Sequence, residues 1–202
     1  MEPFEYVVVI TSLITGLGIA QLLTGTADII SHFRSVKISY PLMLMIGSTF
    51  LNHYQEWFYN YQYSCLITVW SMKNILGLVV YPIVLFILAR MLFPTGLRSQ
   101  ESDLEAYYHD QWPALFTVNV AVIVISVFQD MFFSGIGPLE QLPKFILIAA
   151  HLTFIGFNIN NRKAHLIFQI LFFVGMIAFI LVTDQNLNVV YEKLQMMDAS
   201  GQ

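Results

Sequence analysis

The stretch YVVVITSLITGLGIAQLLTGTADII, residues 6–30, carries no charged side chain before Asp28. A helix of about 20 apolar residues crosses the hydrocarbon core of a bilayer, so this stretch is long enough to span a membrane. It is also longer than the ~7–15 apolar residues of a signal peptide, follows the acidic start MEPFEY and lacks an A-x-A-like cleavage site. We therefore expect a retained membrane-spanning helix.

The rest of the chain repeats this character. Hydrophobic residues make up 57% of the 202 residues and charged residues 11%, and the mean hydropathy is +0.67. Soluble domains carry about 25% charged residues, so the sequence predicts an all-α polytopic membrane protein without a soluble domain. Residues 1–184 are predicted to form a bundle of about six transmembrane helices, which span residues 6–30, 40–61, 75–93, 112–133, 139–158 and 164–182.

Two further segments are predicted to lie along the membrane surface. SDLEAYYHDQW, residues 102–112, places Ser102 and Glu105 at capping-box spacing before a group of aromatic residues. In the tail, 185–202, the residues Leu187, Val190, Tyr191 and Leu194 share one helical face. The tail is expected to be an amphipathic helix or a frayed end.

The distribution of lysine and arginine predicts the orientation. Six of these residues lie at the first, third and fifth connections, and three lie on the opposite side: Arg34, Lys37, Arg90, Arg98, Arg162 and Lys163 against Lys73, Lys144 and Lys193. By the positive-inside rule both termini face outward. In a bacterial host this would be the periplasmic side of the inner membrane.

Composition and motifs exclude several classes of function. A net charge of −4 and the lack of a basic block argue against a nucleic-acid partner. The single cysteine, Cys65, cannot form an internal disulfide or a cysteine metal site. The sequence contains no nucleophile elbow, H-E-x-x-H motif, Walker loop or dinucleotide fingerprint, and we assign no catalytic residue.

Small residues follow one face of the first span. Gly16, Ala20, Thr24, Asp28 and His32 recur every four residues, with Gly18 and Gly25 on a neighbouring ridge. Small residues allow helices to approach closely in lipid, so Gly16, Gly18, Ala20 and Gly25 are predicted helix-packing positions. Alternatively, polar residues of this span line an aqueous path: Thr11, Thr15, Gln21 and Asp28.

The second span contains the polar stretch LNHYQEWFYN, residues 51–60, in which His53, Glu56 and Asn60 share one helical face. An ionised carboxylate at this depth costs at least about 2.5 kcal/mol, so Glu56 must face the bundle interior, be paired or be protonated. Other spans bring polar residues to a similar depth. If the second, fourth and fifth helices are neighbours, we expect one cluster of His53, Glu56, Gln129, Asp130 and His151.

Several interpretations of this cluster remain open. Its members could be interhelical hydrogen-bonding groups, each worth about 0.6 kcal/mol. His53, Glu56, Asp130 and His151 could bind a single metal ion, although a second H-x-x-E motif for a di-metal centre is absent. His53 and His151 could instead be axial ligands of haem b. No cofactor is predicted as the leading interpretation.

The segments FEYVVVITSLITGLGIAQLLTG and NHYQEWF resemble a family of small bacterial inner-membrane proteins. Members of that family open with an acidic, aromatic N-terminus and a glycine-rich first span, and they carry a Glu-Trp pair in the second span. The resemblance implies a bacterial host and a polytopic fold. It implies no activity.

We therefore consider three functions. The first is a proton or cation channel or transporter, in which Glu56 binds the ion, His53 and His151 relay it, and Asp28 with His32 forms the inner exit. The second is a membrane interaction subunit without chemistry of its own, which forms a homo-oligomer or binds a membrane protein through the small-residue face of the first helix. The third is electron transfer through haem b or a quinone. Beyond such a protein partner, the lipid bilayer is the expected environment.

Overall fold

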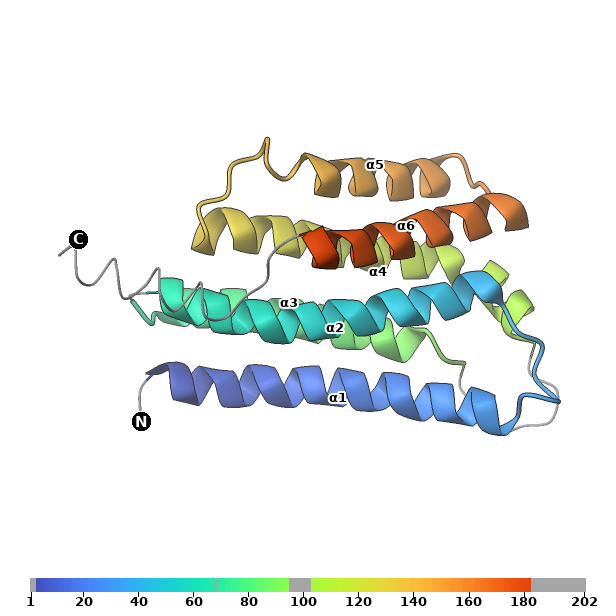
Figure 1. Cartoon of the computed structure of the whole chain (residues 1–202), viewed down its shortest axis with the longest axis horizontal. Coiled ribbons are helices and arrows are strands. Elements are labelled where there is room, and N and C mark those ends of the chain that lie inside the picture. The colour runs from blue at the N-terminus through green and yellow to red at the C-terminus, as the bar shows by residue number, and fades with distance from the viewer. Residues whose placement is uncertain (1–2, 68, 95–102, 183–202) are drawn as a thin grey trace.

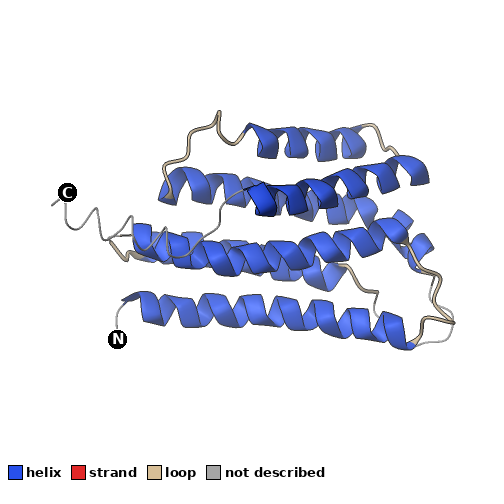
Figure 2. Ribbon diagram, viewed as in Figure 1, coloured by secondary structure: helices blue, strands red, loops and turns tan. Residues whose placement is uncertain are grey.

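The computed structural model describes residues 3–67, 69–94 and 103–182, and this part of the chain is an antiparallel bundle of helices (Figure 1). In the described ranges the chain forms six helices and no strand, and Figure 2 draws them as ribbons. The helices are α1 (Pro3–Ser31), α2 (Tyr40–Leu66), α3 (Met72–Met91), α4 (Leu104–Phe133), α5 (Leu142–Gly156) and α6 (Arg162–Val182).

Consecutive helices run in opposite directions, so the bundle has two distinct ends (Figure 1). The N-terminal end holds the start of α1, α3 and α5 and the end of α2, α4 and α6. The opposite end is here named the basic end, because five of the seven described lysines and arginines lie there: Arg34, Lys37, Arg90, Arg162 and Lys163. Lys73 and Lys144 lie at the N-terminal end.

Helix α2 occupies the centre of the bundle, where it packs against α1, α3, α4 and α6. Helix α1 lies at one edge, against α2 and α3, and α5 lies at the other edge, against α4 (Figure 1). The backbones of α2 and α5 do not approach each other closely in the described structure. The second and fourth helices are therefore neighbours, as the predicted polar cluster required, but the second and fifth are not.

Four helices are long and apolar enough to cross a membrane, over Glu5–Ser31, Met72–Met91, Leu104–Phe133 and Arg162–Val182. They are compatible with an integral membrane protein. Helix α2 has the length but carries the polar stretch around Glu56, and α5 has only 15 residues. An all-helical fold is thus confirmed, while about six transmembrane spans remain a prediction.

The element bounds differ from the predicted spans mainly at polar ends. The predicted surface helix at 102–112 is instead continuous with the fourth span, because α4 begins at Leu104. Its N-cap is Asp103, whose carboxylate accepts a hydrogen bond from the backbone N–H of Ala106 (2.8 Å). Ser102, Arg98 and the tail 185–202 lie outside the described residues.

The apolar core fills the half of the bundle nearest the basic end. Leu42 and Met45 of α2 are buried there together with a large aromatic group of α4, Trp112 and Phe116. The same cluster includes leucines of α1, α3 and α4 and the residue that follows α3: Leu22, Leu85, Leu88, Leu104 and Leu92. The buried polar residues of α2 described below lie toward the other end, where a second, smaller apolar cluster includes Val7, Ile67 and Leu78.

Candidate functional site

A file of buried polar side chains runs along α2 toward the N-terminal end. It consists of Thr49, His53, Glu56, Asn60 and Tyr63, all of which are buried. Their spacing of three or four residues places them on one face of the helix. Because α2 is central, this face lies in the bundle interior, and each polar group there must find a partner or remain unsatisfied.

Glu56 is the central acid of this file and is only 3% exposed. Its Oε1 accepts a hydrogen bond from Asn60 Nδ2 (2.7 Å), one helical turn further on. The phenol groups of Tyr63 and Tyr81 lie within electrostatic reach of its carboxylate. In the described part of the chain, Glu56 forms no salt bridge with a lysine, arginine or histidine.

Asp130 of α4 is the second buried acid, and it has a cation. Lys144 of α5 forms an ion pair with its Oδ2 and also donates a hydrogen bond to Ser126 Oγ (2.6 Å). Tyr63 of α2 donates its hydroxyl to Asp130 Oδ1 (2.5 Å). Both carboxylate oxygens are thus occupied, and this group ties α2, α4 and α5 together.

His53 is fully buried and uses only one of its ring nitrogens. Nδ1 donates to the Thr49 carbonyl oxygen (2.8 Å), because a carbonyl can only accept; in the neutral ring Nε2 is then an acceptor. Nε2 has no hydrogen-bond partner among the described residues. It lies against Gly18 of α1, where an added Cβ would approach Nε2 to 2.0 Å.

His151 is also fully buried, but both of its ring nitrogens are engaged. Nδ1 donates to the Leu147 carbonyl oxygen (2.8 Å), and Nε2 lies 2.9 Å from Asn119 Nδ2. Its ring packs edge-on against Phe168 of α6. His53 and His151 therefore face different neighbours, α1 and α4, and do not form a facing pair of ligands for haem b.

The five residues of the predicted cluster do not form one site. Glu56 and Asp130 share the neighbours Tyr63 and Tyr81. Gln129, however, turns to α3 and donates to the Gly77 carbonyl oxygen (2.9 Å). Within the described ranges, no three His, Cys, Asp or Glu side chains converge as metal ligands, so the four candidates for a metal ion are not brought together.

Asp28 and His32, predicted to form an inner exit, lie near the basic end of α1. The His32 ring binds the Asp28 backbone carbonyl oxygen (2.9 Å) rather than its carboxylate. Asp28 is ten residues beyond Gly18, about 15 Å along the helix. The buried side chains of Leu22 and Met45 belong to the apolar core between these two levels.

The small residues of α1 fall into two settings. Gly18 and Gly25 are buried against His53 and Phe93, respectively, and a Cβ at Gly25 would lie 2.4 Å from the Phe93 ring. Gly16 has no atom within 4 Å of such a Cβ, and Ala20 is exposed. Gly18 and Gly25 thus pack inside this chain, whereas Gly16 and Ala20 face outward.

Sequence reasoning missed Lys144 and Tyr63 as the partners of Asp130. The positive-inside count treats Lys144 only as a cation of the outward-facing side, and Tyr63 lies beyond the predicted second span, 40–61. A usable signal was present: Asp130 near the end of one span and Lys144 near the start of the next lie at one level in an antiparallel hairpin. Sequence reasoning also missed a buried contact at the basic end, between Tyr108 Oη and His165 Nδ1 (2.9 Å).

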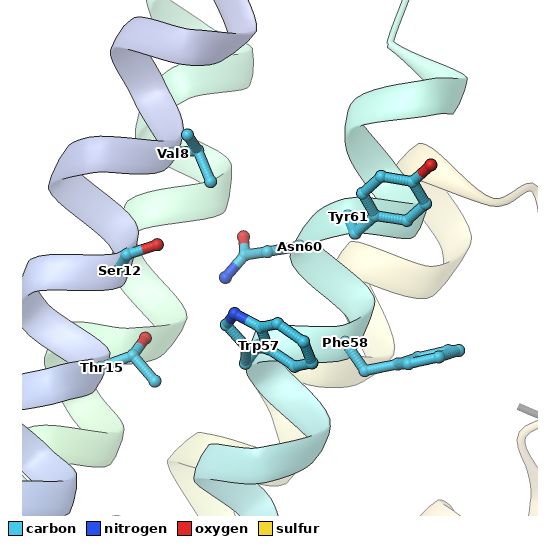
Figure 3. Close-up of a pocket in the computed structure, with 7 residues that line it drawn as sticks. All are labelled: Val8, Ser12, Thr15, Trp57, Phe58, Asn60 and Tyr61. Atoms are coloured by element: carbon cyan, nitrogen blue, oxygen red, sulfur yellow. The ribbon is translucent and has the colours of Figure 1, made fainter. Parts of the chain in front are cut away.

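A pocket of about 230 Å³ lies between α1 and α2 in the N-terminal half. Figure 3 shows Ser12 and Thr15 of α1 opposite Trp57 and Asn60 of α2, with the Asn60 amide directed toward α1. Val8, Phe58 and Tyr61 complete its lining. The pocket reaches the partner of Glu56 but not the pair Asp130–Lys144.

Comparisons with protein-family models, curated proteins and solved structures find no match to this chain. The resemblance to small bacterial inner-membrane proteins therefore remains a prediction. Any function must be argued from the geometry of the site.

Proposed function

We propose that this chain is a polytopic membrane transport protein that moves protons or small cations, with Glu56 as the ion-binding group. One observation carries the proposal: Glu56 is buried at the centre of the bundle without a basic partner in the described structure. A lone carboxylate in such a place must take up a proton or a cation to avoid the cost of an uncompensated buried charge.

The main competing interpretation is that Glu56 only holds helices together. Its hydrogen bond to Asn60 joins two residues of the same helix, one turn apart, and so contributes nothing to helix pairing. A glutamine would accept the same bond without the cost of a charge. The acidic group itself is therefore better explained by ion binding than by structure.

The apolar core favours a gated transporter over an open channel. The polar file on α2 continues from Glu56 through His53 and Thr49 to Ser48, after which Met45 and Leu42 are buried. An ion at Glu56 thus meets a closed apolar layer on the side of the basic end. Transport would require a conformational change that opens this layer. By the positive-inside rule, the basic end would face the cytoplasm.

The test is ion flux into liposomes that contain the purified protein, measured with a pH-sensitive dye and with sodium and potassium indicators. Glu56→Gln keeps the acceptor for Asn60 but has neither a titratable group nor a negative charge to attract a cation, so we expect flux to fall by at least about tenfold. Glu140→Gln makes the same chemical change at an exposed position and should leave flux within about twofold. Equal flux in wild-type protein and Glu56→Gln would remove the central residue of the proposal.

A second candidate, an interaction subunit, is favoured by the outward face of α1. Gly16 and Ala20 leave that face open to the close approach of another helix, and neighbouring Leu13 and Leu17 are more than half exposed. Gly18 and Gly25 cannot test this candidate, because they pack inside the chain.

The suitable variant is Gly16→Leu, with Gly175→Leu on α6 as the matched control, since neither glycine has a neighbour within 4 Å of its Cβ position. Loss of an oligomer only in Gly16→Leu, seen by light scattering in detergent, would support assembly through α1. An unchanged mass in both variants would argue against it.

A further inference from the structure

The pocket between α1 and α2 contains a buried polar atom that no protein group satisfies. Thr15 is 3% exposed and lines the pocket, and its Oγ1 has no hydrogen-bond partner among the described residues. In Figure 3 its side chain lies on the side of α1 that faces Trp57 and Asn60. Buried hydroxyl groups in proteins nearly always have a partner, either a protein group or an ordered water molecule.

A second unsatisfied atom lies one helical turn further along the contact between α1 and α2. His53 Nε2 is fully buried against Gly18, and Gly18 follows Thr15 by three residues on the same face of α1. Of these two residues only Thr15 lines the pocket, so its hydroxyl group is the one nearest to a water molecule bound there. The pocket itself, at about 230 Å³, exceeds the about 15 Å³ that a single water requires.

Asn60 connects this pocket to Glu56. Its side chain lines the pocket, and its Nδ2 donates to Glu56 Oε1. An amide nitrogen cannot coordinate a metal cation, so the group that faces the carboxylate stabilises its charge without supplying a cation ligand. The ionisable groups near Glu56 include His53, one turn earlier on the same face of α2, and the phenols of Tyr63 and Tyr81, while Asp130 is neutralised by Lys144.

We propose that the α1–α2 pocket is a water-binding site through which Glu56 is protonated from the N-terminal end, so that the ion bound at Glu56 is a proton. This rests on the proposed function, and it names the transported species. Because Asn60 and not Glu56 lines the pocket, the Asn60 side chain must turn aside before a hydronium ion there can give one proton to the Glu56 carboxylate and become water. The product is a neutral carboxylic acid, which a buried position tolerates better than a carboxylate.

The first arm of the test asks whether the pocket contains water. In a Cys65→Ala background, Thr15→Cys and Leu13→Cys are each treated with a charged, membrane-impermeant thiosulfonate. Both positions lie at nearly the same depth, but Leu13 is 63% exposed on the outer face of α1, where lipid would surround it. The thiolate attacks the reagent and displaces its sulfinate group, and a thiol ionises to the thiolate only in contact with water, so we expect Thr15→Cys to react at least about tenfold faster.

Equally slow reaction at both positions would overturn the proposal, because the pocket would then be closed or filled by a lipid chain. Ser12→Cys, at a more open position of the same pocket, provides a second measurement if Thr15→Cys does not elute as a folded species. This arm does not depend on transport.

The second arm identifies the ion. Glu56-dependent flux driven by a pH gradient is measured in sodium, in potassium and in a bulky organic cation. We expect the same proton flux in all three. Flux that requires sodium or potassium would overturn the proton assignment but leave the proposed transport function intact. Absence of Glu56-dependent flux for every ion would refute that function, and the labelling result would then still show whether the pocket contains water.

Discussion

Glu56 and Asp130 are two buried acids in the same half of the bundle, yet they have opposite surroundings. Asp130 forms an ion pair with Lys144, which also donates a hydrogen bond to Ser126, and it accepts a hydrogen bond from Tyr63. Its charge is therefore neutralised and its oxygens are satisfied. Glu56 has the Asn60 amide and no cation in the described structure. The bundle can therefore neutralise an acid where the acid has a structural role, and the exception at Glu56 is what points to ion binding.

The helix contacts beside these acids, α1–α2 for Glu56 and α4–α5 for Asp130, are here called seams, and they differ in the same way. Between α4 and α5, an ion pair and hydrogen bonds from Lys144 and Gln141 cross the contact, and Gln141 Oε1 is the one buried polar atom there without a partner among the described residues. Between α1 and α2, the contact is a glycine against a histidine, with two unsatisfied polar atoms and a pocket beside it. A seam with incomplete hydrogen bonding and an open space is easier to separate or hydrate than one tied by an ion pair.

The largest effect on stability is expected from Lys144→Met. The variant leaves Asp130 buried without its cation, which costs about 3 kcal/mol, the lower end for buried ion pairs because the Lys144 side chain is 28% exposed. Thermal unfolding in detergent would measure it. The double variant with Asp130→Asn should recover more than half of the loss, since no uncompensated charge remains.

Lys73→Met is the matched control, because Lys73 lies at the same end of the bundle but is exposed. Its melting temperature should stay close to that of the wild type. If Lys144→Met were as stable as Lys73→Met, Asp130 would not depend on its cation, and the contrast with Glu56 would lose its basis.

A smaller loss is expected from Gly18→Ala in the other seam. The new Cβ would lie 2.0 Å from His53 Nε2, and this ring is fully buried and held by its bond to Thr49. Forcing a methyl group into such a contact costs about 2 kcal/mol. Gly16→Ala adds the same methyl group in open space and should change stability by less than about 1 kcal/mol. Equal melting temperatures for both variants would mean that the α1–α2 seam is not closely packed.

Much of the fold could be predicted because hydrophobic length determines it. Uninterrupted apolar runs gave the first, third and sixth helices to within a few residues. The ends were less predictable where helices continue into polar sequence. Helix α2 extends beyond residue 61 to Leu66, and α4 begins at Leu104, where the Asp103 carboxylate satisfies an N-terminal amide.

The site was less predictable, because it depends on which helices are neighbours. The sequence identifies Glu56 as an acid in an apolar setting, and the structure agrees that it is buried. The sequence does not reveal that Lys144 neutralises Asp130 or that Gln129 donates a hydrogen bond to α3. Nor does it reveal that His53 and His151 face different helices. Gly18 is predicted as a packing position, but only the structure shows that the residue packed against it is His53.

The smallest effect is expected at an ion pair in water, Lys37–Asp103, near the basic end. Lys37 Nζ lies 2.9 Å from Asp103 Oδ2, and the two side chains are 59% and 43% exposed. The hydrogen bond from Lys37, followed by that from the Ala106 N–H, lowers the pKa of Asp103 below its ordinary value. A lowered folded-state pKa stabilises the fold above the ordinary pKa of about 3.9, and this contribution disappears as pH falls through the folded-state value.

Lys37→Ala should therefore cost a few tenths of a kcal/mol at pH 6, as is typical of exposed pairs, and nothing at a pH below both pKa values of Asp103. Melting temperatures of the two proteins across this pH range would measure the difference. The backbone hydrogen bond from Leu104 N to Lys37 O is retained in the variant, so the comparison isolates the charge. A loss at pH 6 as large as that of Lys144→Met would mean that burial is not what distinguishes the Asp130 pair, because the same two charges would then be worth as much in water as inside the bundle.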